Sequence, residues 1–288
     1  MTLAVFGAGG QVGRVLVERA GAAARGFDRA ACDICDAAAV ARALSAMDPS
    51  VVVNCAAYTA VDRAEREPEQ AFAVNAGGAA NLARAAAERS LPIIHLSTDY
   101  VYAGTGSAPH LESAPVAPLN VYGASKAAGD AAVTAANPAH LLLRVSWVFG
   151  VYGSNFVKTM LRLGRERSEL RIVDDQRGGP TEARDIADAI LVIAAICRKP
   201  GFAAWGTCHF AGAPSTSWHG FAEAIFARSG GAGPSLVKIA TRDYPTPARR
   251  PLNSNIDCDR IRRVFGIGQP DWQGSLSRVI AQLAGGAP

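Results

Sequence analysis

A tyrosine and a lysine four residues apart, Tyr122 and Lys126, are the side chains of this sequence best suited to acid–base chemistry. On a helix this spacing places both on one face, roughly 5–6 Å apart at their Cβ atoms. A cation beside a phenol stabilises the phenolate and lowers a pKa that is ordinarily about 10. Tyr122 could then donate a proton at neutral pH to an alkoxide that forms on a substrate carbonyl. Thr98, at the end of an apolar run, could offer a second hydroxyl to the same oxygen.

The N-terminus carries the pattern of a dinucleotide-binding unit, which gives the tyrosine and lysine a context beyond a solvated helix surface. An apolar strand, Leu3 to Phe6, leads into Gly7-Ala-Gly-Gly-Gln-Val-Gly13 and then into a helical run. Gly7 permits a tight turn, Gly10 lets the backbone approach a pyrophosphate, and Gly13 lets the helix pack close to the strand. A plain tight turn can also be rich in glycine, but the position between a strand and a helix favours cofactor binding.

An acidic residue follows at the distance expected for a ribose contact. A weak second strand ends near Asp28, 21 residues after Gly7, where a carboxylate can bind the adenosine ribose. Arg29 beside it would instead favour a 2′-phosphate, so the preference between NADH and NADPH stays open. Asp33 and Ile34 could flank the adenine, although Asp33 also fits a turn or helix cap.

Further strands and helices alternate along the first half. Strands are expected at about 49–57, 91–96 and 139–149, with an alanine-rich helix over about 68–89 in which Asn75 could bond a neighbouring loop. This alternation predicts a Rossmann-type α/β fold, a doubly wound parallel sheet whose strands all end at one edge. Ala57, Thr98 and Trp147 fall at or near such ends, where ligands bind.

The pattern changes after residue 150, which suggests two domains. We expect a dinucleotide-binding domain over 1–150 and a smaller α/β substrate-binding domain over 151–288, with room for some of its segments to pack back on the first. Helices are expected at 156–161, 182–198 and 218–229, and a strand at 170–173. Tyr244 to Pro251 holds three prolines, so it is a stiff loop. Arg249 and Arg250 on this loop could grip a diphosphate, although a surface arginine pair is the alternative.

Composition narrows the class of protein. A net charge of +4, scattered along the chain, argues against nucleic acid binding. The longest apolar run, Ala189 to Cys197, is too short to span a bilayer, and no signal peptide fits the start. Six dispersed cysteines suggest reduced thiols and a cytoplasmic location. Cys32 and Cys35 form an isolated C-x-x-C pair, so we expect no metal site.

Taken together, the motifs resemble the extended short-chain dehydrogenase/reductases, and within them the dTDP-4-dehydrorhamnose reductase family. The resemblance covers nearly the whole chain. It is carried by eight segments of the sequence, namely F-G-x-x-G-Q-V-G at 6–13, N-C-A-A-Y-T-A-V-D at 54–62, S-T-D-Y-V-Y at 97–102, P-L-N-V-Y-G-A-S-K at 118–126, R-V-S-W-V-F at 144–149, N-F-V-K-T-M-L-R-L at 155–163, D-D-Q-R-G-G-P-T at 174–181 and Y-P-T-P-A-R-R-P at 244–251.

The resemblance implies a reaction and a set of site residues. The family reduces the 4-keto group of dTDP-6-deoxy-L-lyxo-4-hexulose to dTDP-L-rhamnose with NADPH or NADH. By this resemblance Tyr122 is the proton donor, Lys126 orients the nicotinamide ribose, and Thr98 binds the reacting oxygen. The residues implied for the cofactor are Gly7, Gly10, Gln11, Val12, Asp28, Arg29, Asp33, Ile34, Ala56, Ala57, Tyr58 and Thr59, and those for the substrate are Thr98, Asp99, Tyr100, Trp147, Asn155, Phe156, Arg249 and Arg250.

Two features of the family do not carry over in full. Tyr58 stands where relatives carry a histidine, which puts fine contacts in doubt but not the reaction. Some members use Mg²⁺ at a dimer contact, and we find no carboxylate cluster in the sequence to support that. A homodimer is a further expectation.

Two other functions stay open. A nucleotide-sugar 4,6-dehydratase or 4-epimerase of the same superfamily is the nearest alternative. A dehydratase usually has Asp-Glu after the threonine, whereas here Asp99-Tyr100 follows Thr98. The other alternative is a noncatalytic, cofactor-binding regulatory subunit, against which the intact Tyr122 and Lys126 argue.

Overall fold

A six-stranded parallel sheet forms the centre of the larger part of the molecule. The computed structural model describes residues 2–230 and 233–286. The strand order is β10-β5-β4-β3-β1-β2, and every neighbouring pair is parallel. Chain order therefore reverses at β1, so a cleft opens beside it at the carboxyl ends of the strands. The strands are β1 (Leu3–Phe6), β2 (Ala24–Phe27), β3 (Val51–Asn54), β4 (Ile93–Thr98), β5 (His140–Val145) and β10 (Gly206–Phe210).

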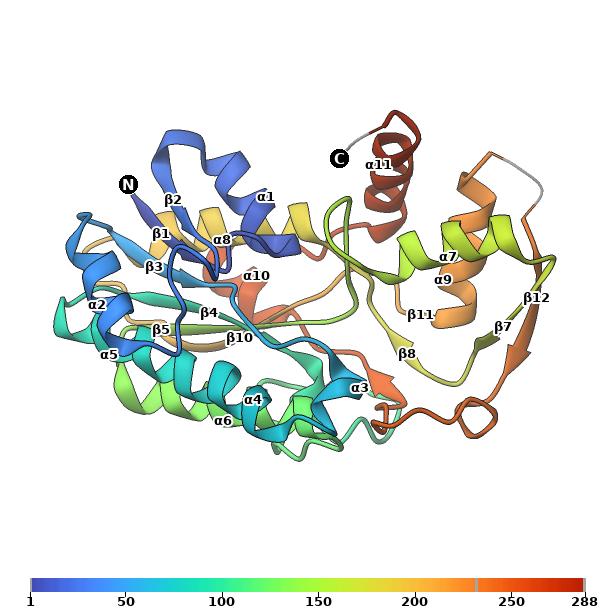
Figure 1. Cartoon of the computed structure of the whole chain (residues 1–288), viewed down its shortest axis with the longest axis horizontal. Helices are drawn as coiled ribbons and strands as arrows, with labels where there is room; N and C mark the ends of the chain where they lie inside the picture. Colours follow the sequence, from blue (N-terminus) through green and yellow to red (C-terminus); the bar gives the residue numbers. More distant parts are fainter. Residues whose placement is uncertain (1, 231–232, 287–288) are drawn as a thin grey trace.

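Helices cover both faces of this sheet (Figure 1). Alternate strand residues point to opposite faces, so Val51 and Val53 pack in one core and Val52 packs in the other. One face is covered by α1 (Gln11–Ala20), α8 (Ala183–Cys197) and α10 (Asp259–Phe265), and the other by α2 (Ala37–Ser45), α5 (Ala79–Glu88) and α6 (Val121–Ala136). This double burial explains why the strands are apolar throughout rather than alternating.

A smaller part with its own core lies beside the carboxyl edge of the sheet (Figure 1). Aromatic side chains dominate this core, among them Phe149, Phe221 and Trp272. Its helices are α7 (Phe156–Glu166), α9 (Trp218–Arg228) and α11 (Trp272–Ala284). Its strands are β7 (Glu169–Val173) with β12 (Ser235–Ile239), and β8 (Arg177–Gly178) between β11 (Thr216–Ser217) and β13 (Asn253–Ser254).

The remaining elements are short. The α-helices α3 (Val61–Ala64) and α4 (Pro68–Phe72) precede a π-helical segment, η2 (Ala73–Gly78). The 3₁₀ turns are η1 (Gly21–Ala23), η3 (Asp99–Val101) and η4 (Thr241–Asp243), and β6 (Val148–Phe149) pairs with β9 (Thr181–Glu182). No helix in the described ranges is long and apolar enough to cross a membrane.

Two predicted elements are interrupted. The strand expected over 139–149 leaves the sheet after Val145, because Ser146 bonds Gly179 and Trp147 adopts a positive φ of 48° before β6 begins. The helix expected over 68–89 contains the π-helical segment η2. The fold class is confirmed, whereas the division at residue 150 stays a prediction. α8 and β10 pack back on the first sheet.

Candidate active site

The end of β4 and the start of α6 bring the predicted catalytic residues together. Asn120 caps α6 by accepting the Gly123 N–H at 2.7 Å. A Cβ on Gly123 would lie 2.2 Å from the Tyr100 carbonyl oxygen, so only glycine allows this close approach. As a result Tyr122 packs edge-on against Tyr100, with ring centroids 5.7 Å apart, and its hydroxyl interacts with Thr98.

Lys126 lies deeper than expected. Its ammonium donates to the Leu96 carbonyl at 2.8 Å and lies 3.2 Å from Nε2 of His95. Burial raises the pKa of Tyr122 above its ordinary value, and the hydrogen bond with Thr98 works against this rise. The expectation of a lowered Tyr122 pKa is therefore not met in this structure, because burial dominates and the hydrogen bonds of Lys126 go to β4. Burial also lowers the pKa of Lys126, to about 8.

Asp99 lies behind Thr98. Its carboxylate accepts the Thr98 hydroxyl at 3.0 Å, and its side chain is buried at 3% exposure. Burial raises the pKa of Asp99 to about 7. A group with such a pKa can carry or release a proton at neutral pH, so the polar environment of Tyr122 depends on pH.

The glycine turn borders a cavity of about 300 Å³. Gly7 has a φ of 83°, and a Cβ there would lie 2.4 Å from the backbone nitrogen of Ala56. A Cβ on Gly13 would lie 2.2 Å from the Gly7 carbonyl oxygen. The turn is thus as tight as a pyrophosphate-binding turn must be. Predicted residues that line this cavity are Gly7, Gly10, Asp28, Arg29, Asp33, Ile34, Ala56, Ala57 and Tyr58.

Other predicted cofactor residues lie elsewhere. Gln11 accepts a hydrogen bond from Asn155, Val12 is buried in the core, and Thr59 is exposed. Asp33 accepts the Cys35 N–H at 2.9 Å, so it forms a turn as well as lining the cavity. Cys32, Arg63, Gln70 and Val74 also line the cavity and were not predicted. Arg63 could have been predicted, because Arg63 and Glu67 are four residues apart shortly after a strand end.

Tyr58 is fixed from two sides. Its hydroxyl donates to Glu67 at 2.7 Å and accepts from Arg63 at 2.9 Å. Its backbone N–H donates to Asn75 at 2.8 Å, and its carbonyl accepts from the same amide at 3.0 Å. Asn75 also donates to Ser125 on α6 at 2.9 Å. The expected bond from Asn75 to a neighbouring loop is confirmed, and it ties the wall of the cofactor cavity to the catalytic helix.

A cavity of about 700 Å³ lies between the sheet edge and the smaller part. Tyr100, Phe156 and Arg250 line it as predicted. Asp62, Gln176, Trp218 and Tyr244 line it as well and were not predicted from the sequence. Arg167 and Arg171 line it too. Aromatic faces together with guanidinium groups suit a nucleotide, because bases stack on aromatic rings and arginine binds phosphate oxygens.

Trp147, Asn155 and Arg249 were also predicted to bind the substrate, but they are not among the residues that line this cavity. Trp147 stacks on Trp218 with ring centroids 3.6 Å apart. Trp218 lines the cavity, and Trp147 lies behind it. Asn155 caps α7 by accepting the Lys158 N–H at 3.1 Å and donates to Gln11 at 3.0 Å. Arg249 is exposed.

The arginine loop is tied to the larger part of the molecule. Arg250 donates to Asp62 at 2.8 Å, and the Ala248 N–H donates to the same carboxylate at 3.2 Å. Asn120, the cap of the catalytic helix, donates to the Arg249 carbonyl at 2.8 Å. The guanidinium of Arg250 is thereby held at the cavity wall.

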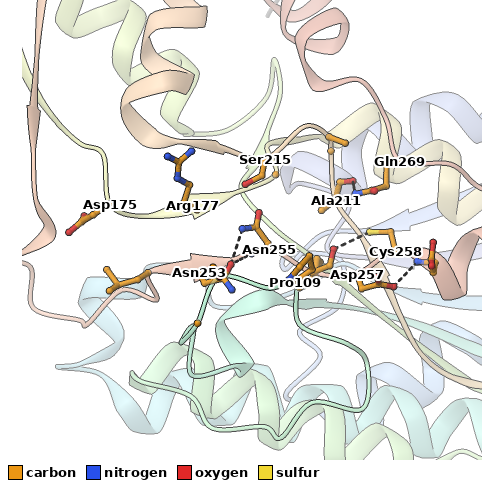
Figure 2. Close-up of a pocket in the computed structure, with 18 residues that line it drawn as sticks. Pro109, Asp175, Arg177, Ala211, Ser215, Asn253, Asn255, Asp257, Cys258 and Gln269 are labelled. Carbon is orange, nitrogen blue, oxygen red and sulfur yellow. Dashed lines mark hydrogen bonds between the residues drawn. The ribbon is translucent and has the colours of Figure 1, made fainter.

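A second large cavity, of about 710 Å³, lies on the opposite side of β8 (Figure 2). Asp175 and Arg177 line this cavity, whereas Gln176 between them lines the cavity described above. None of the predicted site residues is among the described residues that line it. Across residues 2–230 and 233–286, no group of three or more histidine, cysteine, aspartate or glutamate side chains could hold a metal ion.

Comparison with known proteins decides the family. The family described as RmlD substrate binding domain matches residues 1–284. The dTDP-4-dehydrorhamnose reductase of Sinorhizobium fredii is 43% identical over 289 residues, which cover 98% of both chains. The chain belongs to the dTDP-4-dehydrorhamnose reductase family.

Solved structures of this family have the same fold. The dTDP-4-dehydrorhamnose reductase of Clostridium acetobutylicum matches with a TM-score of 0.93 and 34% identity, over 99% of this chain and 100% of that one. The Bacillus anthracis member, solved in complex with NADP, matches with a TM-score of 0.91 and 34% identity, over 98% of this chain and 100% of that one. The predicted membership of the family is confirmed.

Proposed function

We propose that this chain reduces the 4-keto group of dTDP-6-deoxy-L-lyxo-4-hexulose to dTDP-L-rhamnose with NADPH or NADH, a step of rhamnose biosynthesis. One observation carries the proposal most directly, which is that Tyr122 packs against residues that line the cofactor cavity and the cavity of about 700 Å³. Tyr122 packs against Tyr100, which lines the cavity of about 700 Å³, and against the apolar cluster that contains Tyr58, which lines the cofactor cavity. A proton donor is thus available where the two ligands would meet.

The chain's own residues supply the proton and hold the oxygen. A reduced nicotinamide supplies the hydride when bound. Tyr122 donates its hydroxyl proton to the oxygen that was the carbonyl, and Thr98 hydrogen-bonds the same oxygen. The phenolate that remains on Tyr122 is stabilised by the ammonium of Lys126, one helical turn further along α6. One hydride and one proton convert the ketone into an alcohol, so the step balances.

The nucleotide part of the substrate suits the cavity of about 700 Å³ that Tyr100 and Arg250 line. Phe156, Trp218 and Tyr244 offer faces for the thymine ring, and Arg250 offers charge-assisted hydrogen bonds to the diphosphate. Asp62 orients Arg250 before the substrate arrives, which reduces the entropy cost of binding.

The cofactor preference, the location and the assembly complete the proposal. Asp28 favours NADH and Arg29 favours NADPH, so we expect both to be used. A cytoplasmic location agrees with six free cysteines, and a homodimer is the expected assembly.

The direct test is the oxidation of NADPH and of NADH in the presence of the 4-keto sugar supplied by an upstream epimerase. We expect oxidation of the nicotinamide and formation of dTDP-L-rhamnose, identified by NMR. A protein that binds both ligands in thermal-shift assays but oxidises neither nicotinamide would instead be the regulatory subunit considered above. Conversion of dTDP-glucose would indicate a dehydratase.

A further inference from the structure

Lys126 is held by buried groups that take no part in the reaction proposed above. Its side chain is 2% exposed. Its nitrogen is bonded to the Leu96 carbonyl and lies beside His95, so both contacts come from β4. Burial disfavours the charged form of an amine, because water no longer solvates it. The groups around Lys126 therefore decide its position and its charge.

His95 is fully buried, and Asn54 fixes its tautomer. The side-chain oxygen of Asn54 accepts the Ala56 N–H at 3.0 Å, so its amide nitrogen faces Nδ1 of His95, 2.9 Å away. Nδ1 is then an acceptor, and the hydrogen of the neutral imidazole is on Nε2. Burial, together with Lys126, holds the pKa of His95 well below its usual range, so the ring stays neutral.

The Nε2–H of His95 faces both Asp130 and Lys126, and Lys126 can accept this hydrogen only when its amine is neutral. Oδ1 of Asp130 lies 3.8 Å from Nε2, and it has no hydrogen-bond partner within the described ranges. While Lys126 is an ammonium it cannot accept this N–H, which faces the Asp130 carboxylate beyond hydrogen-bond distance. Once Lys126 has lost a proton, its neutral amine can accept the same N–H across 3.2 Å. The histidine is thus in close contact with the lysine in both protonation states and can donate a hydrogen bond to it only in the neutral state.

Asp130 is the anion of this cluster within the described part of the chain. It is 4% exposed, follows Lys126 by one turn of α6, and binds Arg144 of β5 at 3.0 Å through its other oxygen. From β4, Lys126 is faced by the neutral His95. From the segment after β3 it is faced by Cys55, whose pKa burial raises to about 12, so that this thiol is neutral. Tyr122 on α6 is also neutral at pH 7 because burial raises its pKa.

We propose that His95 and Asp130 are positioning residues for Lys126, the histidine fixing where the amine lies and the aspartate keeping it an ammonium at neutral pH. This inference rests on the proposed function, since it assumes the role given to Lys126 there. It assigns to two buried residues behind the site the control of a charge at the reacting centre.

A titration of Lys126 tests the role of Asp130 without any substrate. The chain has four lysines, Lys126, Lys158, Lys199 and Lys238, so ¹³Cε labelling gives few resonances, and Lys126→Met identifies the relevant one. Removal of an opposite charge at this range lowers an amine pKa by about 1–3 units. We expect Asp130→Asn to lower the titration midpoint of Lys126 by at least about one pH unit. An unchanged midpoint would overturn the proposal.

A matched control separates this effect from general disturbance of the core. His140→Phe removes another buried histidine, which bonds Thr134 and the Asn137 carbonyl, and it should leave the Lys126 midpoint unchanged. If Asp130→Asn fails to fold because Arg144 loses its partner, the double variant Asp130→Asn/Arg144→Met removes both charges and is titrated instead. The midpoint should again fall, though by less, because the positive charge of Arg144 is removed as well; a midpoint that does not fall would overturn the proposal.

Kinetics test the role of His95. His95→Phe should lower kcat at least about tenfold while KM for the nucleotide sugar stays within about threefold, as a loss confined to the transition state requires. His95→Gln, whose amide can also donate to Asp130, should recover most of the lost kcat. In Asp130→Asn the alkaline limb of the kcat profile should move to lower pH with the Lys126 midpoint. Wild-type kcat in His95→Phe would contradict the positioning role.

The two proposals fail in different ways. An inactive wild-type protein whose Lys126 titrates as expected in both forms would contradict the proposed function but leave the effect of Asp130 standing. Normal reductase activity with an unshifted midpoint in Asp130→Asn would contradict the role of Asp130 alone.

Discussion

Tyr122 is the residue on which the proposed reduction depends most. Tyr122→Phe removes the hydroxyl and keeps the ring that packs against Tyr100. Loss of a general acid usually costs about 10²–10⁴-fold. We expect turnover to fall by this range while the variant folds and binds NADPH with unchanged affinity, as measured by steady-state kinetics and fluorescence titration. Turnover within threefold of the wild type would remove Tyr122 from the mechanism.

Asp99 should make stability depend on pH in an unusual direction. Its pKa in the folded protein, about 7, is above the ordinary value of 3.8. The native state therefore binds more protons than the unfolded state between these values, and its contribution to stability is lost as pH rises through about 7. We expect the free energy of unfolding of the wild type, minus that of Asp99→Asn, to fall between about pH 5 and about pH 8. Urea unfolding at both pH values measures it, and a difference that rises with pH would contradict the assignment.

The arginine loop allows a comparison between two neighbouring residues. Arg250 lines the substrate cavity, whereas Arg249 next to it is exposed. A charge-assisted hydrogen bond contributes roughly 1.5–3 kcal/mol, which corresponds to about 10- to 100-fold in affinity. We expect Arg250→Ala to raise KM for the nucleotide sugar by this factor and Arg249→Ala to change it little, with NADPH affinity unchanged in both. Equal effects of the two substitutions would show that the loop acts through its total charge.

The π-helical segment η2 should matter for cofactor binding because it holds Asn75 against Tyr58. Asn75→Ala leaves a buried N–H and a carbonyl of Tyr58 without partners, at a cost of about 1–3 kcal/mol in unfolding free energy. We expect a weaker affinity for NADPH as well. Asn137→Ala is the matched control, because Asn137 also bridges backbone groups, of Leu91 and Ala139, outside the cofactor cavity. It should lower stability and leave cofactor affinity unchanged.

Helices and strands were largely predictable because their signals are local. The apolar runs at Leu3–Phe6 and Val51–Asn54 gave β1 and β3, and the glycines gave the turn that follows β1. The break at Ser146 and Trp147 was not predictable. It depends on hydrogen bonds of Ser146, which donates to the Gly179 carbonyl and accepts from the Thr181 hydroxyl, more than thirty residues away. The hydrogen-bond partners of Lys126 on β4 were also not predictable, since the i, i+4 spacing says nothing about which strand faces the helix.

At the level of the whole molecule, two ligands should stabilise different regions. The cofactor cavity is lined by residues before position 75, and the cavity proposed for the substrate mostly by residues between 156 and 250. We expect NADPH to slow hydrogen exchange at the glycine turn and at 55–59, and dTDP to slow it at 156–176 and 244–250. Hydrogen-exchange mass spectrometry with each ligand alone measures this. Protection of the same peptides by both would contradict two separate sites.

The path of the chain between its two parts was the least predictable feature. The family resemblance identified the fold and the reaction, but β10 (Gly206–Phe210) returns to the first sheet beside β5 (His140–Val145) after a long excursion of the chain. Pairing between strands so distant in sequence leaves no periodic signal, because either edge of the sheet offers equivalent hydrogen bonds. Trp218 and Tyr244 were missed for a related reason, since they line the cavity from separate segments, the start of α9 and the residue after η4.

The stack of Trp147 on Trp218 also gives the molecule an optical probe of its own. One indole follows β5 at the sheet edge and the other begins α9, and their planes are 8° from parallel at 3.6 Å. Two indoles this close couple electronically, so their near-ultraviolet circular dichroism and fluorescence depend on the distance between them. Because Trp218 faces the substrate cavity, nucleotide binding should change this signal, and only two other tryptophans, Trp205 and Trp272, contribute a background. Occupancy of the cleft could therefore be followed by stopped-flow spectroscopy in unlabelled protein.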